Sequence, residues 1–146
     1  MKLLKIFLDT SVILSGLFSS TGGSRKLFEA ASAKKLKLVT CFYAIEEAAD
    51  HLDKLKINPN QLSELLTTKI VYLVKNPSEK VIEKFIQVSP DPNDAPILAA
   101  ALLCGADFLV SLDKKHILTS NVRKTLKPMK IGSPKDFWKW VRARKQ

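Results

Sequence analysis

The sequence predicts an α/β fold with a mostly parallel sheet, because short apolar runs alternate with segments that have helical spacing. The clearest runs are residues 3–8, 36–40, 70–74 and 108–112. The run at 108–112 is almost wholly apolar, which is typical of a central parallel strand buried on both faces. The length of 146 residues suits one domain, so we expect a single domain over residues 1–146.

The first two strands are each followed by helical signals. The strand at 3–8 ends at Asp9, and the hydroxyl residues after it can cap a helix. A Gly-Gly turn leads to Ser24, the predicted N-cap of a helix that runs to about residue 33. After the strand at 36–40, apolar residues recur at helical spacing, which predicts a helix over residues 42–55.

Two Asn-Pro pairs predict further helix starts, because Asn is a good N-cap and proline suits the first helical position. They are Asn58-Pro59 and Asn76-Pro77, with the strand at 70–74 between them. A helix over residues 97–103 is apolar on every side and is closed by Gly105, so we expect it inside the fold.

The C-terminal third is predicted to complete the sheet. The strand at 108–112 ends at Asp113, and residues 129–131 form a short edge strand. Ser133 and Pro134 predict the start of the last helix, with an acidic residue at its third position. The aromatic residues of that helix have the spacing of core residues, although they could stack on nucleic-acid bases.

The composition excludes several classes of protein. Hydrophobic residues make up 46% and charged residues 26%, which is typical of a globular chain and not of a disordered one. Two cysteines, Cys41 and Cys104, cannot form a disulfide framework, which favours a reducing compartment. No apolar run approaches the ~20 residues that span a bilayer. We therefore expect a cytoplasmic protein without a membrane partner.

The positive charge is concentrated near the C-terminus. The net charge is +10, and residues 113–146 hold 11 basic and 2 acidic side chains. Such a block can attract a polyanion, and nucleic acid is the commonest one inside cells. The candidates for backbone contacts are Lys114, Lys115, Arg123 and Lys124. The alternative is a solvated surface that keeps the protein soluble.

Several acidic residues lie at the ends of predicted elements. Asp9 and Asp113 each follow a strand, so both should emerge at the carboxyl edge of the sheet, where α/β folds bind ligands. Asp94 precedes the buried helix, and Glu46 and Glu47 lie on the helix after residue 40. The pattern predicts a cluster of carboxylates.

Such a cluster needs a compensating charge. Two carboxylates ~4 Å apart repel by about 4 kcal/mol at an effective dielectric constant of about 20. Oxygen ligands without clustered cysteines or histidines are what Mg²⁺ or Mn²⁺ prefers. A carboxylate-bound divalent ion beside a basic surface suits the hydrolysis of phosphodiester bonds.

Each candidate also has a purely structural interpretation. Asp9 and Asp94 could be helix caps and nothing more, and Asp113 could be an ordinary turn residue. A lone Glu46 or Glu47 could be a solvated helix position. His116 is expected to be a surface or turn residue more than a catalyst.

The ordered set of these motifs resembles the PIN domain family, including the stand-alone PilT N-terminus-like and VapC-like toxin ribonucleases. The resemblance rests on Leu8-Asp9-Thr10-Ser11-Val12, Glu46-Glu47, Asp91-Pro92-Asn93-Asp94 and Leu109-Val110-Ser111-Leu112-Asp113. It extends from residue 6 to about residue 141. It implies a Rossmann-like three-layer α/β/α sandwich and Mg²⁺- or Mn²⁺-dependent cleavage of RNA.

The resemblance also implies roles for particular residues. Four acids match both the metal ligands and the catalytic acids of the family: Asp9, Glu47, Asp94 and Asp113. Three residues match supporting positions. Ser11 can bond the first acid or a metal-bound water, Asp91 can be an outer acid or a ligand of a second metal ion, and Ser111 supplies a hydroxyl. Glu47 is preferred to Glu46 because it lies five residues before the apolar Leu52, although the choice stays open.

Two departures from the family pattern are present. Ser111 stands where members commonly have Thr, which removes a methyl group and keeps the hydroxyl. Lys114-Lys115-His116 replaces a segment that is often acidic, which leaves a fifth acidic ligand in doubt.

The leading interpretation is a metal-dependent endoribonuclease, as the toxin of a toxin–antitoxin pair. Its partners would be RNA, a cognate antitoxin and a second copy in a homodimer. One alternative is a catalytically inactive module that binds RNA or a protein partner. Another is a small-molecule phosphatase or receiver-like domain, but Ser11 occupies a position where the phosphatase motif needs a second Asp.

Overall fold

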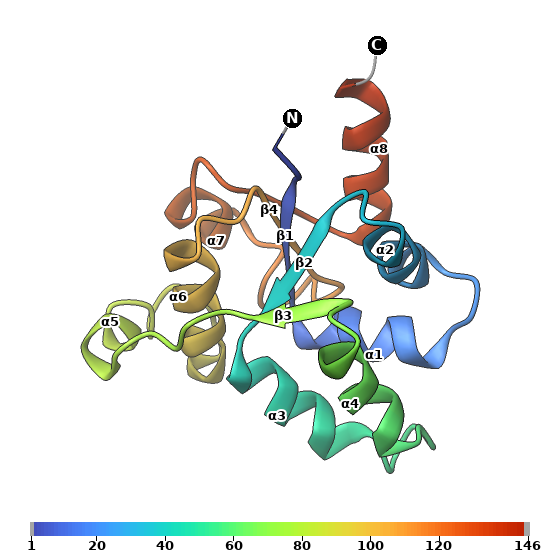
Figure 1. The fold of residues 1–146 in the computed structure, drawn as a ribbon. Helices are drawn as coiled ribbons and strands as arrows, with labels where there is room; N and C mark the ends of the chain where they lie inside the picture. The colour runs from blue at the N-terminus through green and yellow to red at the C-terminus, as the bar shows by residue number, and fades with distance from the viewer. Residues whose placement is uncertain (1, 145–146) are drawn as a thin grey trace.

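The computed structural model describes residues 2–144 and contains a five-stranded sheet in which every strand is parallel to its neighbours. The strand order is β3-β2-β1-β4-β5 (Figure 1). The strands are β1 (Lys5–Leu8), β2 (Lys37–Thr40), β3 (Val71–Leu73), β4 (Phe108–Val110) and β5 (Lys130–Gly132). The predicted parallel α/β fold is confirmed, and the short strand after residue 128 is an edge strand as expected.

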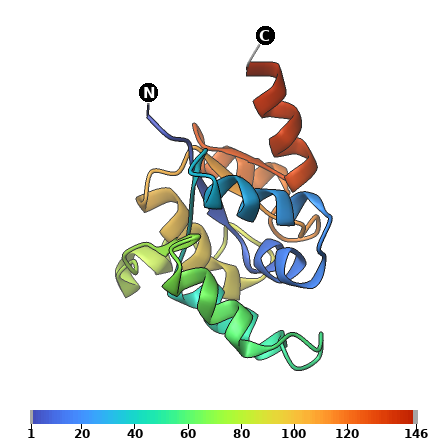
Figure 2. The same cartoon turned by 45° about the vertical axis from the view of Figure 1, so that its right-hand side comes forward.

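Helices cover both faces of the sheet. They are α1 (Thr10–Phe18), α2 (Gly23–Ser32), α3 (Phe42–His51), α4 (Pro59–Thr67), α5 (Glu79–Glu83), α6 (Ala95–Leu103), α7 (Ser120–Thr125) and α8 (Pro134–Arg144), with a 3₁₀ turn, η1 (Pro92–Asp94), before α6. Figures 1 and 2 show α6 and α7 on one side of the sheet and α2 and α8 on the other. The fold is therefore the three-layer α/β/α sandwich that the sequence predicts.

The interior strands are buried because both of their faces are covered by helices. Ile6, Phe7 and Leu8 of β1 are 0% exposed, and every residue of β4 is buried. Helix α6 is buried from Ala95 to Ala101 apart from Pro96. It ends at Leu103 with Cys104 as its C-cap, and Gly105 follows with a φ of +69°, which glycine adopts most readily. None of the helices in the described part of the chain is long and apolar enough to cross a membrane.

The strand order fixes the place of a ligand site. The chain moves from β1 outward to β3, then crosses back to β4 on the other side of β1, so strand order reverses between β1 and β4. Leu8 pairs with Val110, and the backbone N–H of Asp9 donates to the carbonyl of Val110 at 3.0 Å. The residues that follow these two strands therefore emerge side by side at the switch point, where open α/β sheets bind ligands.

Two predicted helix starts are wrong. Helix α2 begins at Gly23 with Gly22 as its N-cap, so Ser24 lies in the first turn and does not cap it. A Cβ on Gly23 would lie 3.2 Å from Cβ of Pro134, which explains a glycine where α2 meets α8. The N-cap of α5 is Ser78 and not Asn76, because the Ser78 hydroxyl accepts the N–H of Val81 at 3.3 Å.

Other predicted boundaries hold. Asn58 caps α4 and forms a capping box with Gln61, and Ser133 and Asp136 exchange the equivalent bonds at the start of α8. The helix predicted over residues 42–55 is shorter, because α3 ends at His51 and the buried Leu52 leads into turns. The apolar spacing continues past the helix because these turns still pack on the core.

The packing of α1 on α2 depends on Gly16. A Cβ at this position would lie 2.4 Å from Cε2 of Phe28, and Phe28 is only 3% exposed, so its ring has no space to move. We expect Gly16→Ala to lower the free energy of unfolding by about 1–2 kcal/mol, because overpacking outweighs the better helix propensity of alanine. Urea unfolding measures this, and adding Phe28→Leu should recover much of the loss. A neutral or stabilising Gly16→Ala would contradict the tight contact.

Candidate active site

Asp9 follows β1 directly and is 5% exposed. It occupies the N-cap position of α1, yet its carboxylate makes no capping bond. Oδ2 instead accepts hydrogen bonds from the hydroxyls of Ser111, at 2.6 Å, and Ser11, at 3.1 Å. The capping interpretation therefore does not account for this carboxylate, which is directed toward the end of β4.

The two serines also fix the chain after β4. The backbone N–H of Leu112 donates to Oγ of Ser11, and that of Asp113 donates to Oγ of Ser111, each at 3.0 Å. Each hydroxyl thus donates to Asp9 and accepts an amide from the β4 loop. We name Asp9, Ser11, Ser111 and these two amides the serine bridge.

Burial raises the pKa of Asp9, and repulsion from Asp113 raises it further. The hydroxyls of Ser111 and Ser11 oppose this rise because they bond the charged form. Without a compensating cation, the ionised form of Asp9 is therefore destabilised.

Asp94 lies at the end of η1 and at the N-cap of α6, where it too makes no capping bond. It is 8% exposed, and its Oδ2 accepts the hydroxyl of Ser89 at 2.8 Å. Burial raises the pKa of Asp94 to about 6, the Ser89 hydroxyl opposes the rise, and repulsion from Asp9, Asp91 and Asp113 adds to it. These interactions place Asp94 among other carboxylates.

Asp113 stabilises a turn, as predicted, with one carboxylate oxygen, and its other oxygen faces a side chain. Its Oδ1 accepts the backbone N–H groups of Lys115, at 3.1 Å, and His116, at 2.9 Å, so it does stabilise a turn. Its Oδ2 lies 3.1 Å from Nδ1 of His116. One ligand atom from each of Asp94, Asp113 and His116 can be chosen so that all lie within 4.8 Å of one another.

Glu47 is the glutamate that faces the acids. It is partly buried on α3, whereas Glu46 is exposed. Burial raises the pKa of Glu47, the Thr10 hydroxyl opposes this, and repulsion from Asp9 and Asp91 adds to it. Asp91 accepts the backbone N–H of Asn93 at 3.0 Å, so it belongs to the turn before Asp94. It acts on the other acids through its negative charge.

A family model described as PIN domain matches residues 5–115 of this chain, a span that contains all four of these acids. The chain belongs to the PIN domain family. PIN domains are generally metal-dependent nucleases that act on RNA. No curated protein matches the chain.

Two residues of this PIN domain site were missed in the sequence. His116 lies in a turn, which was one of the two expected places, but its imidazole also lies against Asp113 and within reach of Asp94. Ser89 bonds Asp94 and also accepts the backbone N–H of Asp91 at 3.1 Å. The spacing of His116, three residues after Asp113, is a signal for a contact across one turn, whereas nothing in the sequence singles out Ser89.

The predicted RNA-binding cations of the PIN domain occupy two places. Lys114 and Lys115 are exposed and adjoin Asp113, at the rim of the acidic cluster. Arg123 and Lys124 are exposed on α7, and the guanidinium of Arg123 donates to the carbonyl of Ile131 on β5. Only the first pair adjoins one of the acids.

The residues of the site fit a hard divalent cation. The donors are carboxylate oxygens with one imidazole nitrogen, a set that suits Mg²⁺ or Mn²⁺. Within residues 2–144, no lysine or arginine forms an ion pair with any of the four acids. Burial is the largest cause of the raised pKa values of Asp9, Glu47 and Asp94, and repulsion between the acids adds to it.

Proposed function

We propose that this PIN domain is an endoribonuclease that hydrolyses RNA phosphodiester bonds with the help of Mg²⁺ or Mn²⁺. One observation carries the proposal: acids from three distant parts of the chain repel one another at the switch point of the sheet, and no basic side chain pairs with them. An inactive module that binds a polyanion has no use for such a cluster, since the carboxylates would repel the ligand.

The geometry favours a division of roles among the acids. Asp94 and Asp113, with His116 beside them, would hold the ion. Asp9 lies outside that group, and the serine bridge would keep it close to the loop that carries Asp113. When bound there, the ion would lower the pKa of a water molecule and offset the charge of the attacked phosphate. Glu47 would accept a proton, since burial raises its pKa and makes it a stronger base than an exposed glutamate. Lys114 and Lys115 would contact the RNA backbone, with Arg123 and Lys124 further along it.

The proposal is tested by incubating end-labelled single-stranded RNA with the protein. We expect cleavage with Mn²⁺ or Mg²⁺, none with EDTA, and recovery when excess metal is restored. By the family resemblance, the products should carry a 5′-phosphate and a 3′-hydroxyl. Cleavage that persists in EDTA would contradict the proposal. RNA binding without metal-dependent cleavage would favour the inactive module, and hydrolysis of p-nitrophenyl phosphate alone would favour the phosphatase.

The resemblance to VapC-like proteins supports a toxin role, with an antitoxin and a homodimer as partners. Both cysteines of the chain are free thiols, which agrees with a reducing cytoplasm. Induced expression should arrest growth in a bacterial host, whereas an Asp9→Asn chain should not, and co-purification with the product of a neighbouring gene would identify the antitoxin.

A further inference from the structure

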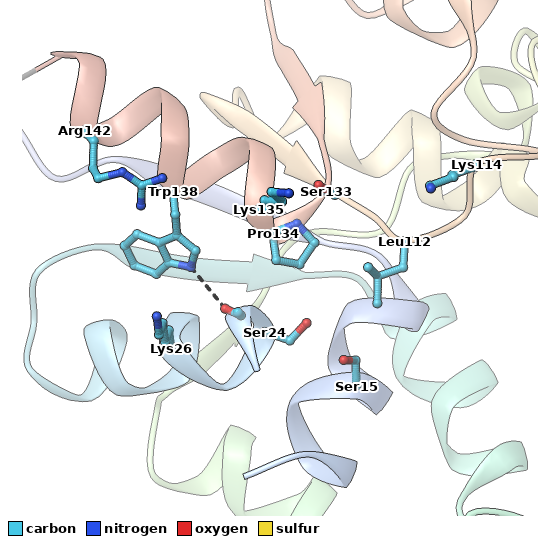
Figure 3. Close-up of a pocket in the computed structure, with 11 residues that line it drawn as sticks. Ser15, Ser24, Lys26, Leu112, Lys114, Ser133, Pro134, Lys135, Trp138 and Arg142 are labelled. Carbon is cyan, nitrogen blue, oxygen red and sulfur yellow. Dashed lines mark hydrogen bonds between the residues drawn. The ribbon is translucent and has the colours of Figure 1, made fainter. Parts of the chain in front are cut away.

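A cavity lies beside the acidic cluster, between α1, α2, the β4 loop and α8 (Figure 3). Its volume is about 620 Å³, within the range of small-ligand sites. Leu112 and Lys114 line it, and they are the chain neighbours of Asp113. A strand of nucleic acid with one phosphate at the acids would therefore have its adjoining nucleotides near this cavity.

The rim of the cavity is strongly basic. Four cations line it, and no acidic side chain does: Lys26, Lys114, Lys135 and Arg142. All four are exposed, and within the described residues none forms an ion pair. Figure 3 shows the Trp138 indole between Arg142 and Lys26 at one end, and Lys114 beside Leu112 at the other. The cations come from three separate segments, which indicates a surface complementary to an anion.

The floor of the cavity is apolar and held in place. Trp138 donates its indole N–H to the carbonyl of Gly23 at 3.1 Å, and its ring packs edge-on against Phe137 at 5.0 Å between centroids. Pro134 and the half-exposed Leu112 extend this floor. Ser24, only 3% exposed, also lines the cavity. An aromatic ring that is held in place, with basic side chains around it, suits a nucleotide, because a nucleotide combines a flat base with an anionic phosphate.

We propose that this cavity binds a nucleotide of the RNA strand next to the phosphate that is cut. The base would stack on Trp138, and its phosphate would be bound by Arg142 with Lys135 or Lys26. This inference rests on the proposed function, because it assumes that RNA is the substrate of the acidic cluster. It adds Lys26 on α2 to the basic block after residue 112, and it places Lys135 and Arg142 of α8 at the binding site, although they were not among the cations named for backbone contacts.

The binding test uses the full chain in EDTA, so that RNA is not cleaved. We measure RNA affinity by the anisotropy of a fluorescein-labelled single-stranded RNA. Arg142→Ala should weaken binding about tenfold, because it removes one charge-assisted hydrogen bond to the phosphate. The slope of log K against log salt should become shallower by about 0.7, as expected for one phosphate contact to a single strand. Lys139→Ala is the matched control, since Lys139 is exposed on the same helix and does not line the cavity.

The stacking test uses Trp140→Phe, which leaves Trp138 as the remaining tryptophan of the two in the chain. RNA should then quench the tryptophan fluorescence, and Arg142→Ala should shift that quenching to about tenfold higher RNA concentration. Equal weakening by Arg142→Ala and Lys139→Ala, with no quenching, would overturn the proposal. So would tight binding of polyglutamate without binding of RNA, which would instead indicate an acidic protein partner.

The two proposals fail in different ways. If wild-type protein cleaves RNA with Mn²⁺ but Arg142→Ala binds like the control, the nucleotide site is wrong and the nuclease assignment stands. If Arg142→Ala weakens RNA binding and no metal-dependent cleavage occurs, the cavity binds RNA and the nuclease assignment is wrong.

Discussion

Asp9→Asn should reduce metal-dependent RNA cleavage at least about 10³-fold, because a metal-ligand interaction contributes several kcal/mol to the transition state. The same variant should unfold at a higher temperature than the wild-type protein in EDTA. Burial and the charge of Asp113 make the ionised carboxylate unfavourable, and a neutral amide of the same shape removes that cost. The hydroxyls of Ser11 and Ser111 can still donate to the amide oxygen.

Two measurements separate this prediction from simple unfolding. Calorimetry in EDTA should show that the unfolding temperature of Asp9→Asn rises by about 2–4 °C for each kcal/mol of stability gained. Its circular dichroism spectrum should match that of the wild-type protein. Asp53→Asn is the matched control, because Asp53 is exposed and forms no ion pair among residues 2–144. A stable Asp9→Asn protein that cleaves RNA at the wild-type rate would contradict the assignment of the site. A less stable one would show that the buried charge is already compensated.

Protonation of Asp94 should control both the stability of the metal-free protein and its affinity for Mn²⁺. The pKa of Asp94 is raised to about 6, so the native state holds this proton more tightly than the unfolded chain does. Its stabilising contribution is complete below about pH 4 and is lost as the pH rises through about 6, a loss of roughly 1–3 kcal/mol. Metal binding requires the deprotonated form, so Mn²⁺ affinity should rise about tenfold per pH unit up to about pH 6.

Asp94→Asn provides the comparison for both effects. Urea unfolding in EDTA from about pH 4 to about pH 7 should show that the wild-type protein loses stability relative to this variant. Titration calorimetry should show weak Mn²⁺ binding by Asp94→Asn with little dependence on pH, whereas Asp53→Asn should retain the wild-type dependence. A flat Mn²⁺ affinity for wild type across this range would exclude Asp94 as a ligand.

The sequence predicts the sheet well because the fold is set by buried apolar strands. Each of the four clearest runs contains an observed strand that is shorter at one or both ends, and the edge strand predicted at 129–131 lies one residue later, at Lys130–Gly132. Helix starts were predictable where a side chain caps the backbone, as at Asn58 and Ser133. They were not predictable at Gly22, because this N-cap has no side chain to cap the helix and the next residue, Gly23, is the one that meets Pro134 of α8.

The candidate site was predictable to the extent that it depends on topology. Asp9 and Asp113 follow neighbouring parallel strands, so their convergence follows from the position of the strands in the chain. Contacts across turns were only partly predictable: the spacing of Asp113 and His116 permits one, whereas nothing in the sequence singles out Ser89. His116 faces Asp113 because the β4 loop turns back within three residues, and Ser89 reaches Asp94 because η1 does the same. Such contacts depend on backbone angles that residue types alone do not specify.

The serine bridge couples two parts of the site that lie far apart in the sequence. Both hydroxyls that hold Asp9 also receive the amides of Leu112 and Asp113. The first acid and the loop that carries the last one therefore shift together, and neither can be repositioned alone. A substitution at either serine would therefore act on both sides of the acid set at once, at Asp9 and at the loop that carries Asp113.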